Sequence, residues 1–262
     1  MKSLICLFSF VLTTLNLPAG EEVKYQAGDI TAHGYLALPK SASAENKVPG
    51  VVVVHEWWGH NAYARKRADM LADLGYAALA IDMYGEGKLA EHPKDAGGFA
   101  QEATAKLETM KVRFLGGMKF LQQQEAVNDK EIAAIGYCMG GKICLQMAAI
   151  KLPDLKGVAS FHGALNVDFP AETKSLDAKV LVCHGNDDTF IPKEVVDAFK
   201  AKMKELGADF TFEGYDGAIH SFTNPDATEL GKKNGIRVGY HKEADEKSWK
   251  ALQVFLKKCF AA

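Results

Sequence analysis

The sequence predicts one α/β domain with a mostly parallel, doubly wound sheet and helices on both faces. Short apolar runs alternate along the chain with longer segments of helical spacing, which is the pattern of parallel strands joined by crossover helices. Residues 51–54 are four consecutive valines, as expected of a strand that is buried on both faces of a sheet. The length of 262 residues and the hydrophobic content of 48% allow one sizeable core.

Each element is expected from its local pattern. The expected strands are residues 51–54, 76–81, 131–135, 157–161, 180–183 and 209–213, and the expected helices are residues 61–74, 96–124, 142–150, 193–206 and 241–260. Gly75 follows helix 61–74 as a C-terminal cap, because glycine readily adopts the left-handed conformation that is common there. The pair Gly116-Gly117 predicts a break in helix 96–124.

The first 20 residues have the layout of a secretory signal peptide. Lys2 precedes an uncharged apolar stretch, residues 3–17, and small residues follow before the acidic pair Glu21-Glu22. The apolar stretch is short for a transmembrane span, and the alternative is an uncleaved N-terminal anchor. We therefore expect a signal peptide at residues 1–20, a single domain at residues 21–262, and export to the periplasm or the exterior without stable membrane association after cleavage.

Composition argues against several classes of partner. The 31 basic and 33 acidic residues leave a net charge of −2, which gives no basic surface for nucleic acid. No C-x-x-C pair and no H-E-x-x-H motif occurs, so we expect no metal site and no cofactor. Cys144 and Cys183 fall in apolar segments and are expected to be packed thiols.

Residues 135–141, Ile-Gly-Tyr-Cys-Met-Gly-Gly, carry the clearest functional signal. The pattern G-x-C-x-G between a strand and a helix is that of a nucleophile elbow, with cysteine in place of the usual serine. The flanking glycines remove β-carbons that would clash in so tight a turn. The helix that follows directs its N-terminus at Cys138, which favours the thiolate. The alternative is a buried core cysteine beside a glycine turn.

A nucleophile of this kind needs a histidine base and an orienting acid, in the chain order nucleophile, acid, histidine. The loop 184–192 follows the strand 180–183 and offers two candidate acids. Asp188 is preferred because it lies three residues past Gly185, and Asp187 is the rival. Either aspartate also suits a turn or a helix cap.

His220 lies in the loop after the last predicted strand, where the base of such a triad belongs. His162 and His184 are weaker candidates, because each directly follows an apolar strand and could be a packed histidine. Ligands of doubly wound sheets bind at the carboxyl ends of the strands, and every candidate lies at such an end.

Glu56 and Trp57 follow the valine strand and should lie near the elbow. The backbone N–H of Trp57 could pair with that of Met139 to form an oxyanion hole, in which loss of one donor costs a rate factor of about a hundred to a thousand. Glu56 could instead be a solvated loop carboxylate. Trp57 and Trp58 could pack in the core, line the substrate pocket, or both.

Taken in order along the chain, these residues resemble the dienelactone hydrolase family. The matching segments are residues 51–59, 82–84, 136–141, 184–192 and 220–222. The resemblance implies an α/β-hydrolase fold and a triad of Cys138, Asp188 and His220. It also implies that Glu56 holds the resting thiol and is released to help deprotonate it when substrate binds.

One departure concerns the substrate. Family members that act on dienelactone carry an arginine soon after the tyrosine that matches Tyr84, whereas Lys88 stands nearby here. Lysine is a point charge without the two-pronged geometry of arginine. We therefore expect hydrolysis of a small ester, lactone or thioester other than dienelactone through an acyl-cysteine, with Tyr84, Lys88 and Trp58 contacting the substrate.

Two other functions remain open at this point. The first is a secreted general carboxylesterase or a small peptidase on the same fold. The second belongs to a different class: a non-catalytic binding or redox-sensing protein, in which an exposed Cys138 thiolate is oxidised.

Overall fold

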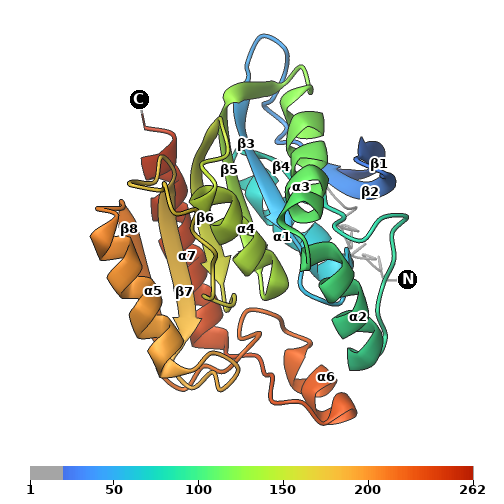
Figure 1. Cartoon of the computed structure of the whole chain (residues 1–262). Helices are drawn as coiled ribbons and strands as arrows, with labels where there is room; N and C mark the ends of the chain where they lie inside the picture. Colours follow the sequence, from blue (N-terminus) through green and yellow to red (C-terminus); the bar gives the residue numbers. More distant parts are fainter. Residues whose placement is uncertain (1–19, 262) are drawn as a thin grey trace, which may run out of the picture.

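Eight strands form one sheet within residues 20–261, the part of the chain that the computed structural model describes (Figure 1). They are β1 (Gly20–Ala27), β2 (Ile30–Ala37), β3 (Val48–Val54), β4 (Ala77–Ile81), β5 (Val127–Tyr137), β6 (Leu155–Phe161), β7 (Lys179–Gly185) and β8 (Phe210–Tyr215). The expected signal peptide lies outside the described residues, apart from Gly20, which begins β1.

The strand order is β1-β2-β4-β3-β5-β6-β7-β8. β1 pairs with β2, and β2 with β4, in antiparallel fashion. All other neighbours are parallel, from β4 through β3 to β8. The expected α/β fold with a mostly parallel sheet is confirmed.

Seven helices connect the strands in the described part of the chain. They are α1 (Ala62–Asp73), α2 (Pro93–Thr104), α3 (Leu107–Gln122), α4 (Met139–Ala149), α5 (Lys193–Glu205), α6 (Ala227–Asn234) and α7 (Lys242–Cys259). One core lies between the sheet and helices α3, α4 and α5. A second core lies on the other face, under α1 and α7. Val52 and Val54 of β3 enter the first core, and Val51 and Val53 the second, which explains the unbroken valine run.

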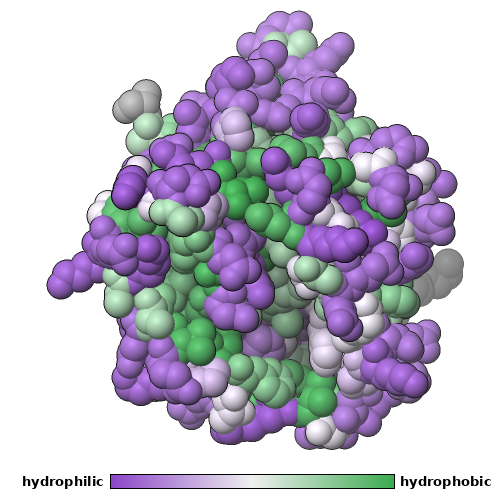
Figure 2. All heavy atoms as spheres, viewed as in Figure 1, coloured by the Kyte–Doolittle hydropathy of each residue, from purple (hydrophilic) through white to green (hydrophobic). Residues whose placement is uncertain are grey.

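Figure 2 shows the face that carries α3, α4 and α5. Hydrophilic residues cover most of it, and apolar surface shows between α4 and α5. A shallow groove of about 360 Å³ is lined in part by Val167 and Phe169 of the loop after β6 and by Val195 of α5. None of the helices within residues 20–261 is long and apolar enough to cross a membrane. Cys144 and Cys183 are fully buried free thiols, as expected.

The expected break at Gly116-Gly117 is wrong. The helical segment divides instead at Ala105 and Lys106, between α2 and α3. A β-carbon on Gly116 would lie 2.6 Å from the Cα of Ala27, and one on Gly117 would lie 2.4 Å from the side chain of Ile81. These glycines therefore let α3 approach the sheet closely, and the helix continues through them.

Candidate active site

The turn between β5 and α4 holds Cys138 in a strained conformation, with φ 54° and ψ −115°. A non-glycine residue in this region costs free energy, and such strain gathers at functional sites. A β-carbon on Gly136 would lie 2.1 Å from the carbonyl oxygen of Gly140. A β-carbon on Gly140 would lie 2.3 Å from the carbonyl oxygen of Val54, at the end of β3. The two glycines are thus required for the turn to close and to contact β3.

The loops after β7 and β8 bring Asp188 and His220 together. Nδ1 of His220 donates to Oδ2 of Asp188 over 2.8 Å, and both residues are buried. The other carboxylate oxygen of Asp188 accepts from the N–H of Phe190 at 2.8 Å. Asp187 is exposed, and its N–H is directed to the carbonyl of Ala218. The geometry therefore favours Asp188 over Asp187 as the partner of His220.

The charges around His220 favour its protonated form. Burial lowers the pKa of His220, but the charge and hydrogen bond of the Cys138 sulfur, with those of Asp188, raise it to about 10 overall. Because Nδ1 is engaged with Asp188, the opposite nitrogen of the ring is left for the sulfur. Cys138 itself is only partly buried. The arrangement can hold a thiolate beside an imidazolium, open to a small substrate.

Glu56 lies buried just beyond the end of β3. Its Oε2 accepts from the side-chain amide of Asn224 at 2.7 Å, and its Oε1 has no hydrogen-bond partner among the described residues. Burial raises the pKa of Glu56, and the polar groups of Asn224 and Ser221 and the charge of His220 offset this only in part. A carboxyl group with a raised pKa is a better proton acceptor near neutral pH than an ordinary glutamate.

Two backbone N–H groups are available near Cys138. Neither Trp57 nor Met139 donates its N–H to another residue of the described chain. Met139 is the first residue of α4, where N–H groups have no partner within the helix. Tyr84 donates its hydroxyl to the carbonyl of Trp57 at 2.9 Å. The same hydroxyl lies 3.4 Å from the sulfur of Met139, so Tyr84 links the loop after β3 to the start of α4.

The three residues expected to contact substrate differ in their exposure to solvent. Tyr84 and Trp58 are buried, and the rings of Trp57 and Trp58 lie 5.0 Å apart. Lys88 is exposed, and its ammonium makes no ion pair or hydrogen bond to any described residue. Phe190, which sequence reasoning did not single out, is 51% exposed. Its ring packs edge-on with the ring of His220, and the two ring centroids lie 5.1 Å apart.

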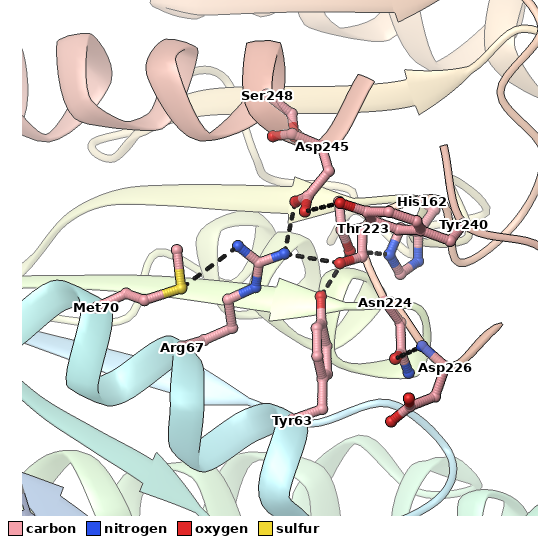
Figure 3. A network of polar contacts seen from close by, with 10 residues as sticks. All are labelled: Tyr63, Arg67, Met70, His162, Thr223, Asn224, Asp226, Tyr240, Asp245 and Ser248. Carbon is pink, nitrogen blue, oxygen red and sulfur yellow. Dashed lines mark hydrogen bonds and ion pairs between the residues drawn. The ribbon is translucent and has the colours of Figure 1, made fainter. Parts of the chain in front are cut away.

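A buried polar network behind the site was also not foreseen (Figure 3). Nδ1 of His162 accepts the backbone N–H of Cys138 at 3.1 Å, and its Nε2 lies 2.7 Å from the hydroxyl of Thr223. Burial lowers the pKa of His162 well below its usual value, so the ring is neutral. Arg67 donates to the carbonyl of Thr223 at 2.7 Å and to Asp245 at 2.5 Å. The network ties the Cys138 turn to the loop that carries His220.

Within residues 20–261, no three His, Cys, Asp or Glu side chains are grouped so that they could hold a metal ion. The chemical groups present at the site are a thiol, an imidazole, two carboxyl groups and backbone N–H groups. Such a set can supply a nucleophile, a base with its orienting acid, and donors for a developing negative charge.

The comparisons with known proteins show the family to which the chain belongs. The model of the dienelactone hydrolase family matches residues 32–260. A protein of Aquifex aeolicus, provisionally named a carboxymethylenebutenolidase, is 28% identical over 211 residues, which are 78% of this chain and 87% of that protein.

A solved structure of a dienelactone hydrolase-like promiscuous phosphotriesterase from metagenomic libraries is 31% identical. It superimposes with a TM-score of 0.85, covering 92% of this chain and 98% of the other. A structure from Klebsiella pneumoniae, provisionally named a dienelactone hydrolase and 22% identical, shares the fold with a TM-score of 0.72, covering 90% of this chain and 97% of the other. The chain therefore belongs to the dienelactone hydrolase family and is an ester or lactone hydrolase with the α/β-hydrolase fold.

Proposed function

We propose that the chain hydrolyses small carboxylic esters, lactones or thioesters through an acyl-cysteine on Cys138. The observation that supports this most is the meeting of three elements at one point. The strained Cys138 turn lies beside His220, His220 is held by Asp188 at 2.8 Å, and the N–H groups of Trp57 and Met139 have no partner within residues 20–261.

The first half of the reaction forms the acyl-cysteine. The Cys138 thiolate attacks the substrate carbonyl, a C–S bond forms, and the carbonyl oxygen becomes an oxyanion that the N–H groups of Trp57 and Met139 stabilise. The oxyanion collapses, the C–O bond to the leaving group breaks, and His220 gives its proton to the departing alkoxide. For a lactone, the leaving alkoxide stays attached through the acyl chain.

The second half releases the acid. His220, now neutral, takes a proton from water, and the resulting hydroxide attacks the thioester carbonyl. The C–S bond then breaks and leaves the thiolate beside the protonated His220, as at the start. Asp188 holds the imidazole in the orientation that both halves require.

Glu56 is proposed as the group that controls the thiol. Its position next to Trp57 and its raised pKa suit a carboxylate that suppresses the thiolate when ionised and accepts the thiol proton when substrate arrives. Its bond to Asn224 corresponds in this proposal to the released position.

The substrate is proposed to be an ester or lactone other than dienelactone, because an exposed lysine, Lys88, stands where a carboxylate-binding arginine would be needed. Export remains a proposal that rests on the composition of residues 1–20. Because a signal peptide is removed from the mature protein, a purified protein that begins at residue 21 should keep its activity.

Kinetics of Cys138→Ala test the proposed function. Loss of the nucleophile in such a triad lowers turnover by up to about a millionfold, so p-nitrophenyl acetate hydrolysis should fall to background while the fold persists. Cys144→Ala, which changes another thiol of the same helix region, is the matched control and should keep turnover. Cys138→Ala with more than about a tenth of the wild-type rate would contradict the assignment.

A further inference from the structure

A pocket of about 600 Å³ opens beside the proposed active site. It lies between the loop after β3, the loop after β4 and helix α6, which Figure 1 shows beyond the carboxyl ends of the parallel strands. Its lining residues are Trp58, Asn61, Leu89, Ala90, Glu91, Asp226, Glu229, Leu230 and Lys233. This volume is in the range of pockets that bind small molecules.

The pocket wall is joined to both the oxyanion loop and Glu56. Trp58 follows the proposed donor Trp57, and its carbonyl accepts from the N–H of Ala90 at 3.0 Å. On the other side, the N–H of Asp226 donates to the side chain of Asn224 at 3.0 Å, and Asn224 in turn holds Glu56. The loops that carry the proposed oxyanion donor and the partner of Glu56 therefore continue into the wall of this pocket.

Part of the pocket lining is apolar. Trp58 is buried, whereas Leu89 is 53% exposed and Leu230 is half-buried. An exposed leucine in a pocket lining gains by covering apolar surface of a ligand. The lining therefore fits an alkyl or aryl group.

The rim carries an excess of negative charge. Three carboxylates, those of Glu91, Asp226 and Glu229, stand against the single ammonium of Lys233, a formal charge of −2. Glu229 is paired with Lys232 at 2.8 Å, but Glu91 and Asp226 have no ion-pair partner among the described residues. Such a rim repels a substrate carboxylate and attracts a cation, which the ring of Trp58 also favours.

We propose that this pocket is the substrate subsite and that it selects esters whose non-reacting group is apolar and carries a positive charge. Neutral apolar groups bind less well, and carboxylates are rejected. This inference rests on the proposed function, since it names the substrate class for hydrolysis at Cys138.

Two series of three matched esters test the proposal by their kcat/KM values. In the first, the alcohol is choline, its neutral isostere 3,3-dimethylbutanol, or 4-hydroxybutanoate, each esterified with butyrate. In the second, the same three end groups stand on the acyl chain of an ethyl ester. Acid release is followed by titration at neutral pH, where the rim carboxylates are ionised.

The wild-type enzyme should prefer the cationic to the neutral ester, and the neutral to the anionic, in at least one series. Glu91→Gln and Asp226→Asn should each reduce the ratio of cationic to neutral kcat/KM by about fivefold, the factor that Coulomb's law gives for charges about 4 Å apart in water. Salt at 1 M should reduce the same ratio, because the screening length falls to about 3 Å.

Matched controls separate charge from packing and from folding. Glu194→Gln removes an exposed carboxylate of α5 that lines a different groove, and it should leave the ratio unchanged. Leu230→Ala should lower kcat/KM for cationic and neutral esters alike by at least about fourfold, the value of one buried methylene.

Equal kcat/KM for the three end groups in both series, or ratios that Glu91→Gln and Asp226→Asn leave unchanged, would overturn the subsite. Turnover of p-nitrophenyl acetate that depends on Cys138, together with such a result, would overturn the subsite alone. Absence of Cys138-dependent turnover of every ester would overturn the proposed function as well.

Discussion

Asp188→Asn changes the one contact that sets the orientation of His220. The carboxylate accepts from Nδ1 of His220 with one oxygen and from the N–H of Phe190 with the other, both at 2.8 Å. Asparagine has the same shape but only one acceptor oxygen. If the N–H of Phe190 keeps that oxygen, the amide NH₂ faces Nδ1, which must then accept. The proton of the neutral His220 ring then lies on the nitrogen that faces Cys138. This nitrogen must be free to accept a proton during the reaction.

The expected loss is large because the wrong tautomer cannot take the proton of the attacking water in the second half of the reaction. The corresponding Asp→Asn change in a Ser-His-Asp triad lowers turnover by about ten-thousandfold. That factor equals about 5 kcal/mol of activation free energy. The charge of Asp188 is also one of the causes that raise the pKa of His220, so this pKa should fall in the variant.

Hydrolysis of p-nitrophenyl acetate by Asp188→Asn and by Asp187→Asn measures the difference. Asp187 is exposed, and we expect its variant to stay within about twofold of the wild type, since exposed substitutions rarely change free energies by more than about 0.5 kcal/mol. Circular dichroism checks that both variants fold. The reasoning is refuted if Asp187→Asn loses as much activity as Asp188→Asn, or if Asp188→Asn keeps more than about a tenth of the rate.

Four further predictions concern other parts of the site. Gly140→Ala places a β-carbon 2.3 Å from the backbone of β3, and we expect a loss of unfolding free energy of about 1–3 kcal/mol or more, measured by urea denaturation. Arg67→Met leaves the partly buried Asp245 without its guanidinium partner and should cost up to about 3–5 kcal/mol in the same assay; a loss below about 1 kcal/mol would speak against the network. Glu56→Gln should speed iodoacetamide labelling of Cys138 and lower ester turnover, and unchanged labelling with normal turnover would make Glu56 an ordinary loop residue. Nitrogen NMR of the His220 ring should give a lower pKa in Asp188→Asn than in the wild type, because the carboxylate that raises this pKa is replaced by a neutral amide; an equal pKa in both proteins would contradict the contact of His220 with Asp188.

The parts of the fold that were predictable have strong local patterns. The valine run of β3 and the glycine turn at Cys138 can be recognised from a few adjacent residues. The hairpin of β1 and β2 was not expected, because β1 is largely exposed. Its few buried residues stand between exposed charged and polar ones, so no clear apolar pattern marks the strand. Helix α6 was also missed, since it is short and buries only Ala227 and Gly231.

The candidate site divides in a similar way. Cys138 is marked by its own turn, and the loops with Asp188 and His220 follow strands that are visible in the sequence. The contacts of Arg67 were not predictable, because its partners Thr223 and Asp245 lie 156 and 178 residues away along the chain. His162 was considered a packed histidine, and it is buried, but its bond to the N–H of Cys138 depends on the pairing of β5 with β6.

Mass spectrometry of the enzyme quenched during turnover of p-nitrophenyl acetate tests the central claim most directly. We expect a transient acetyl group on the peptide that contains Cys138, lost on further incubation and absent from Cys138→Ala. Turnover without any acetyl group on Cys138, or an acetyl group of equal yield in Cys138→Ala, would contradict it.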